Sequence, residues 1–195
     1  MKLHHIALAA IAAATFATQA QAAVFNGAST AGGNTFTEYT SGSALSFDLD
    51  LASQAPVTLN FTLESADFSG DAMTFNALVR NLSGLGFDSV RVSLSGITFA
   101  APAGTITTDG FSAVSASGHS ATQAWASFVP GLASEFYIGN PLATATEANW
   151  TLNLDGLQAG QQFSVTVAVP EPETYGLMAA GLGVMGLIAR RRKAA

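Results

Sequence analysis

Few residues in this sequence could carry hydrolytic chemistry. His119 is the only histidine outside the first ten residues, and Ser112 and Ser120 lie close to it along the chain. A serine hydrolase needs a nucleophile, a histidine base oriented by a third group, and a preformed oxyanion site. The Gly-x-Ser-x-Gly pattern that presents such a serine on a sharp turn is absent. We therefore predict no catalytic residues and no enzyme, and keep a secreted hydrolase as the third-ranked alternative.

Metal-binding chemistry rests on a handful of carboxylates. One histidine without any cysteine argues against zinc, whereas calcium needs only oxygen ligands. Asp48 and Asp50 share one face of a predicted strand, and Asp67 and Asp71 flank a glycine turn. These four are weak calcium candidates, because aspartates near turns also serve the backbone. We predict no cofactor, although calcium is possible at these four aspartates.

Aromatic side chains suggest a third chemistry, the stacking of sugar rings. Trp125, Trp150, Tyr39 and Tyr137 each combine a large apolar ring with a polar tip. Trp150 shares the apolar side of its strand with Leu152 and Leu154, which predicts a core position. A carbohydrate- or calcium-binding surface module is therefore the second-ranked function.

The elements that must position these residues are strands. Apolar and polar residues alternate with period two in six stretches, which predicts strands with one face on a core. Their apolar positions lie at 45–51, 57–63, 73–79, 90–94, 150–154 and 163–169. Turn signals separate the stretches, among them Ser69-Gly70-Asp71, Ser83-Gly84, Asp109-Gly110 and Asp155-Gly156.

This pattern predicts an all-β domain over residues 23–169, an antiparallel β-sandwich with a jelly roll as the alternative. The Gly- and Ser-rich segment from Ala23 to Gly42 is either a loose lead-in or contains an edge strand at Asn34–Thr40. The last predicted strand runs directly into Pro170.

Charge excludes some partners of this domain. Between Ala23 and Val169 the chain has 11 acidic residues, two arginines (Arg80 and Arg91) and no lysine. Nucleic-acid affinity depends on several Lys and Arg side chains displacing counterions, so nucleic-acid binding is excluded. The chain has no cysteine, so a hydrophobic core must stabilise the domain without disulfides.

The N-terminus has the three parts of a secretory signal peptide. Lys2 supplies a positive charge, residues 6–17 are apolar, and Ala20-Gln21-Ala22 supplies a small-x-small cleavage pattern. The apolar stretch is shorter than the roughly 20 residues that a membrane span needs. We predict that signal peptidase removes residues 1–22, cutting after Ala22.

The C-terminus has a second three-part pattern, residues 170–195. Pro170-Glu171-Pro172 is followed by an apolar stretch at 174–189 and then by the basic cluster Arg190, Arg191, Arg192 and Lys193. The prolines hold the chain extended. A helix over 174–189 would be about 24 Å long, short of the bilayer core. The basic cluster would remain cytoplasmic by the positive-inside rule, which agrees with the topology set by the signal peptide.

This order of extended motif, short apolar helix and terminal basic cluster resembles the PEP-CTERM sorting signal. The resemblance covers about the last 26 residues and leaves the fold and task of residues 23–169 open. It implies processing by an exosortase, a membrane enzyme of Gram-negative bacteria that is thought to cut near the Pro-Glu-Pro motif. It also implies an inner-membrane intermediate, delivery to the cell surface or extracellular matrix, and association with exopolysaccharide and biofilm. The leading function is accordingly a structural protein of the cell surface or matrix.

Overall fold

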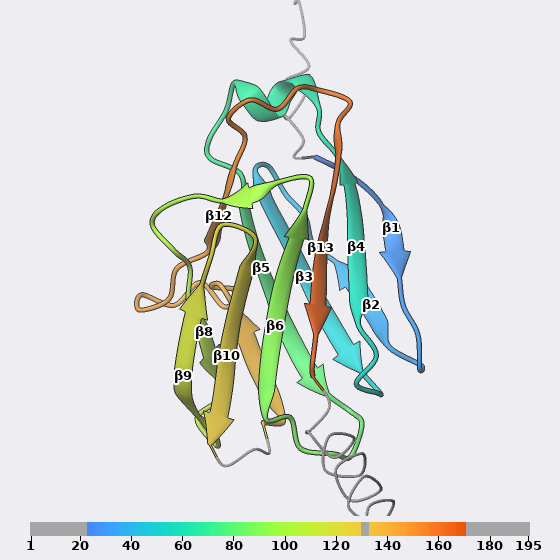
Figure 1. Ribbon diagram of the computed structural model, residues 1–195, viewed down its shortest axis with the longest axis vertical. Coiled ribbons are helices and arrows are strands. Elements are labelled where there is room, and N and C mark those ends of the chain that lie inside the picture. The colour runs from blue at the N-terminus through green and yellow to red at the C-terminus, as the bar shows by residue number, and fades with distance from the viewer. Residues whose placement is uncertain (1–22, 130–132, 171–195) are drawn as a thin grey trace, which may run out of the picture.

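The computed structural model describes residues 23–129 and 133–170, which form strands and one short 3₁₀ helix, η1 (Ser65–Phe68) (Figure 1). The predicted signal peptide, residues 1–22, lies outside the described residues. So does the tail from Glu171 onward, with the apolar helix predicted at 174–189 and the basic cluster. Within the described ranges, no helix has the length and apolar character that a membrane span requires.

The strands form two sheets. Sheet A has six strands, in the spatial order β1 (Val24–Ser29), β4 (Val57–Thr62), β13 (Gln162–Ala168), β6 (Ser89–Ser95), β10 (Gln123–Val129) and β9 (Ala113–His119). Sheet B contains, in order, β2 (Thr35–Glu38), β3 (Ala44–Leu51), β5 (Thr74–Asn81), β11 (Glu135–Ile138) and β8 (Ile106–Thr108). In addition, β12 (Trp150–Asn153) pairs with β5 and with β7 (Thr98–Phe99).

The two sheets face each other across one hydrophobic core, with sheet A toward the viewer in Figure 1. Both inner faces contribute to it: Phe47 of β3 packs on Phe61 of β4, and Phe128 of β10 packs on Phe136 of β11. Each of the six strands predicted from alternation is present, and its apolar positions are buried as predicted, except that β12 ends at Asn153 and Leu154 is only partly buried. The fold is therefore an all-β, two-layer arrangement.

One expectation is wrong: the sheets are not entirely antiparallel. Strand β3 pairs with β5 in parallel, with Asp50 opposite Arg80. The connection explains this, because the chain leaves sheet B after β3, forms β4 in sheet A, and returns through η1 to β5. A parallel pair requires such a crossover, whereas a short hairpin gives an antiparallel one.

Short or weakly patterned strands complete the edges of the sheets. The proposed edge strand at Asn34–Thr40 exists as β2, at the edge of sheet B. Residues 24–29, which were not predicted as a strand, form β1 at one edge of sheet A, and β9 forms the opposite edge. Strand β13 ends at Ala168, Val169 is still buried, and Pro170 is exposed. The fold thus ends immediately before the sorting motif.

Candidate functional site

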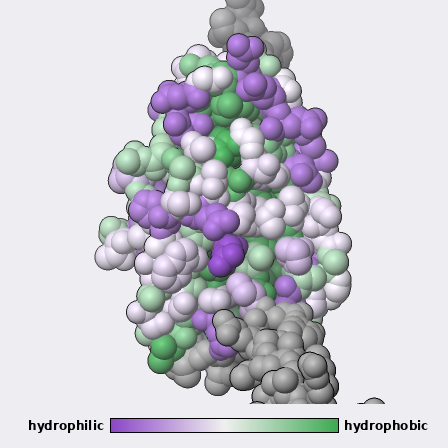
Figure 2. Space-filling model, viewed as in Figure 1, coloured by the Kyte–Doolittle hydropathy of each residue, from purple (hydrophilic) through white to green (hydrophobic). Residues whose placement is uncertain are grey.

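The outer face of sheet A is uncharged except for one arginine. In the four central strands of this sheet, β4, β13, β6 and β10, outward-facing residues alternate with buried ones. Because these strands are neighbours, the predicted polar faces of β4, β6 and β13 lie side by side. We call this surface the polar platform. It consists of Thr58, Asn60, Thr62, Gln162, Ser164, Thr166, Ala168, Ser89, Arg91, Ser93, Ser95, Gln123, Trp125, Ser127 and Val129. None of these described residues is a carboxylate, and the centre of this face is largely pale in Figure 2, the colour of near-neutral hydropathy.

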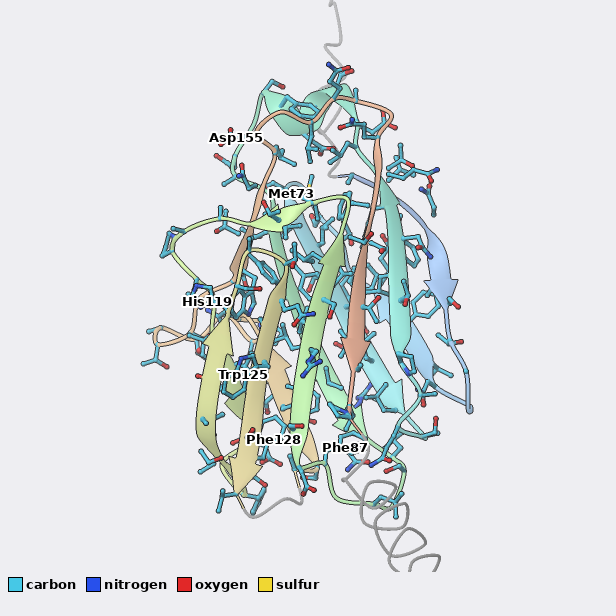
Figure 3. The ribbon with its side chains drawn as sticks, viewed as in Figure 1. Met73, Phe87, His119, Trp125, Phe128 and Asp155 are labelled. Atoms are coloured by element: carbon cyan, nitrogen blue, oxygen red, sulfur yellow. The ribbon has the colours of Figure 1, made fainter. Side chains whose placement is uncertain are left out.

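Trp125 is the aromatic residue of the polar platform. It is 39% exposed and lies directly opposite Gly118 of β9 on one side and Arg91 of β6 on the other. A Cβ placed on Gly118 would come within 2.9 Å of the indole, so the ring lies across the glycine. Beyond Arg91 the next residue in the row is Ala168. The residues at both ends of this row are small, and both Trp125, which is labelled in Figure 3, and Arg91 are exposed.

A groove runs along the β9 edge of the sandwich, beside Trp125. One hollow of about 270 Å³ is lined by Trp125, Trp150, His119 and neighbouring Thr and Gly residues. A second, of about 280 Å³, shares His119 with the first and is lined by residues 99–101 and 119–121. The His119 ring packs edge-on to Trp150, whose indole N–H donates to the Thr105 carbonyl at 3.0 Å. Trp150 is 3% exposed, which confirms its predicted core position.

The two serines considered for a hydrolase both take part in local hydrogen bonds. The Ser120 hydroxyl accepts hydrogen bonds from the Thr122 and Gln123 amides and so holds a tight turn. Ser112 is buried, and its carbonyl accepts a bond from the Thr108 hydroxyl. In the described part of the chain no hydrogen bond joins His119 to either serine. His119 and Ser120 line the same hollow, while Ser112 lies buried just before β9.

The outer face of sheet B, unlike that of sheet A, carries several charged side chains, among them two aspartates and an arginine. Arg80 donates to Asp50 at 2.6 Å and lies 3.6 Å from Asp48, because the parallel register places β5 beside both aspartates. Partial burial of Asp48 raises the pKa of its carboxyl, an effect that the nearby Arg80 charge only partly offsets. Both carboxylates of this predicted calcium pair are thus already matched to a cation.

The second calcium pair does not come together as a site. Asp67 accepts a hydrogen bond from the Glu64 amide at 2.7 Å and caps η1, while Asp71 is exposed in the turn that follows. Among the described residues, no three His, Cys, Asp or Glu side chains converge as a metal site would need. The four aspartates therefore receive no structural support as calcium ligands.

Tyr137, another of the aromatic candidates, is 9% exposed and bonded to a neighbouring acid rather than free for stacking. Its hydroxyl donates to Glu135 at 2.6 Å. That bond, followed by burial and nearby negative charge, raises the pKa of Tyr137 to about 12. Because the folded state holds this proton more tightly than the unfolded chain, the stabilisation is complete below pH about 10 and is lost as pH rises toward 12.

We expect Glu135→Gln to lower the pKa of Tyr137 toward its ordinary value, since the charge that favours the protonated phenol is removed. An ultraviolet titration of tyrosine ionisation measures this directly. Glu64→Gln, an exposed acid next to η1, serves as the control and should leave the titration unchanged. An unaltered titration in Glu135→Gln would show that Glu135 does not hold this proton.

The polar platform could not be predicted as one surface from the sequence. The alternation of Ser89, Arg91 and Ser93, and likewise of Ser164 and Thr166, is visible along the chain. Which strands are neighbours, however, depends on long-range pairings such as β13 with β6 and β10 with β6. The sequence did not predict which face of the sheet Trp125 occupies. Its neighbours Ala124 and Ala126 are too small to mark an apolar face by alternation. The structure now puts it on the outer face.

Comparison with known proteins identifies the C-terminal segment. The family model of the PEP-CTERM protein-sorting motif matches residues 168–193, from the end of β13 through the basic cluster. Among curated proteins and solved structures, no significant match is found. Of the sorting residues predicted from sequence, Pro170 is described and exposed, while Glu171, Pro172 and the signal-peptidase positions Ala20 and Ala22 lie outside the described residues. The chain therefore carries a PEP-CTERM protein-sorting motif, which begins at the last residue of β13, where the all-β domain ends.

Proposed function

We propose that this chain is the precursor of a non-catalytic structural protein of the cell surface or extracellular matrix of a Gram-negative bacterium. The single observation that carries the proposal is the PEP-CTERM motif at residues 168–193, which marks an exosortase-sorted, exported protein. In its place of delivery the β domain associates with exopolysaccharide, as a component of a biofilm matrix. Signal peptidase and exosortase are its processing partners.

The position at which the fold ends supports the proposal that exosortase removes the tail. The buried core closes at Val169, and the next residue is the exposed Pro170 of the sorting motif. A protease that cuts just beyond this point would leave all of the core in the product. The tail acts as a removable membrane handle, which keeps the protein at the inner membrane until the cut.

Mass spectrometry of the protein recovered from its producing cells tests the proposal. We expect a mature form that begins at Ala23 and lacks the chain beyond the Pro-Glu-Pro motif. Replacing both prolines, Pro170→Ala with Pro172→Ala, should leave the tail attached and the protein in the membrane fraction. Pro56→Ala, which alters an exposed proline before β4, is the matched control and should be processed normally.

Two results would count against the proposal. A mature protein that keeps residues 173–195 would be a plain membrane-anchored protein. A correctly trimmed protein that separates completely from the extracellular matrix would be exported but would have no structural role there.

A further inference from the structure

The polar platform has the donors and acceptors of a sugar-binding surface and lacks groups that would repel an anion. Its residues are mostly hydroxyls and amides, each of which can both donate and accept hydrogen bonds, as sugar hydroxyls do. Neighbouring strands lie about 4.8 Å apart, so the rows from β10 to β4 span about 14 Å. Such a width suits several linked sugar rings rather than one small molecule.

Charge on this face is limited to Arg91. The domain has two arginines, and the other, Arg80, is paired with Asp50 and Asp48 on the far sheet. Arg91 is exposed, and no salt bridge engages it among the described residues. A guanidinium binds a carboxylate through two parallel hydrogen bonds, which makes Arg91 suited to an acidic group on a ligand.

Trp125 stands directly beside Arg91 across the β10–β6 pair. An exposed indole offers an apolar face for the C–H side of a sugar ring. A uronic acid is a sugar whose ring carries a carboxylate. One such unit could stack its ring on Trp125 and place its carboxylate on Arg91. This juxtaposition of a stacking surface with a single uncommitted cation distinguishes the platform from an ordinary solvated sheet.

A polar hollow of about 290 Å³ opens farther along the same face. It is lined by the platform residues Asn60, Ser95, Gln162 and Ser164, together with Asn26 of β1 and the strand residues Phe61 and Phe163. Four neighbouring strands, β1, β4, β13 and β6, contribute to it, and Asn60 lies opposite Ser164, which lies opposite Ser95. A chain that begins at Trp125 and crosses the platform would reach this hollow and its uncharged amides.

The acidic character of the whole domain does not oppose an anionic ligand here. Asp48, Asp50 and Glu135 lie on strands of sheet B, and packed sheets are about 10 Å apart. Salt at physiological concentration screens charges beyond about 8 Å. The carboxylates of sheet B are therefore screened from a ligand on Arg91, and the acid nearest to the platform is the exposed Asp88, just before the start of β6.

We propose that the polar platform binds an acidic, uronate-containing polysaccharide, with one ring stacked on Trp125, its carboxylate on Arg91, and the following sugars on the hydroxyls and amides toward Asn60. The inference deepens the proposed function, since it assigns the exopolysaccharide contact to one face of the domain. It also sets the ligand chemistry: negatively charged carbohydrate.

Native gel electrophoresis of the full chain in mild detergent tests this, with polygalacturonate in the gel as the probe and a neutral cellulose ether in a parallel gel. Polygalacturonate should retard the protein, and the neutral polymer should do so much less. Trp125→Ala and Arg91→Ala should each raise the apparent Kd for polygalacturonate, obtained from the retardation at several polymer concentrations, by about tenfold. This is the loss expected for a stacking contact or a charged hydrogen bond. Both residues are exposed, so unchanged melting temperatures should show that the variants fold.

The chain provides matched controls. Tyr39→Ala removes an aromatic that is 58% exposed and lies beyond the end of β2, and Arg80→Ala removes the other arginine with the same change of charge. Both should bind like the unaltered chain. No retardation by polygalacturonate, equal retardation by the neutral polymer, or equal losses in Arg80→Ala and Arg91→Ala would each overturn the proposal. Tail removal and matrix fractionation are measured separately, so the proposed function can stand while this assignment fails.

Discussion

Phe61→Ala is expected to lower the free energy of unfolding by about 3–5 kcal/mol, the range for truncating a fully buried aromatic. Phe61 is 0% exposed, and its ring lies 4.9 Å from that of Phe163, 5.6 Å from Phe25 and 5.8 Å from Phe47. These partners come from both sheets, so the cavity would open at the join between the layers. Urea denaturation of the purified protein measures the loss.

The expected effect is large relative to the whole. Single domains have free energies of unfolding of about 5–15 kcal/mol, and this chain has no cysteine with which a disulfide could compensate. Phe111→Ala makes the same substitution at a side chain that is 88% exposed, and should change stability by less than about 0.5 kcal/mol. Similar losses in the two variants would mean that Phe61 does not join the sheets.

The core was predictable because period-two alternation is a local signal. In β3 the residues Leu45, Phe47, Leu49 and Leu51 are all buried, as their spacing indicated, and β4, β6 and β13 follow the same rule. The rule works because successive side chains of a strand point to opposite faces, whatever the rest of the fold does. It says which residues are inside without saying which strands are neighbours.

Two strands of sheet A escaped the same rule because their apolar residues do not all fall on one face. Strand β9 has the sequence AVSASGH, in which Val114 alone is a sizeable apolar residue, and β10 buries Ala124, Ala126 and Phe128 but carries Trp125 and Val129 on its exposed face. Their strand character comes from pairing with each other and with β6. The parallel β3–β5 pair likewise depends on a crossover through sheet A, which no local pattern encodes.

The polar platform combines a part that the sequence predicts with a part that it does not. The polar character of several strands' outer sides could be read from the sequence, but the row formed by Gly118, Trp125, Arg91 and Ala168 depends on pairing the consecutive strands β9 and β10 with β6 and β13, which are distant in the chain. The sorting motif is the contrary case. It is a contiguous segment whose family match needs no tertiary contact, so the sequence alone identified it.

Gly96→Ala is the second substitution for which we expect a large loss, about 2–5 kcal/mol. Gly96 has φ of +78°, a conformation that costs an L-residue about 1–2 kcal/mol. A Cβ there would also lie 2.6 Å from the Gln162 carbonyl oxygen and 3.3 Å from the Phe163 Cα. These are backbone atoms of β13, so relief requires β6 and β13 to move apart, at an overpacking cost of about 1–3 kcal/mol.

Gly84→Ala separates the two causes. Gly84 has a similar φ of +73°, but nothing lies within 4 Å of its added Cβ, so only the backbone strain should appear. The difference between the two variants, measured by urea denaturation, is therefore the cost of forcing β6 from β13. Because these strands carry Arg91, Ser95 and Ser164, Gly96→Ala should also weaken polygalacturonate retardation, while Gly84→Ala should not. Equal stability losses in the two variants would show that β6 and β13 yield freely at this point, and the platform would then be less rigid than its strand pairing implies.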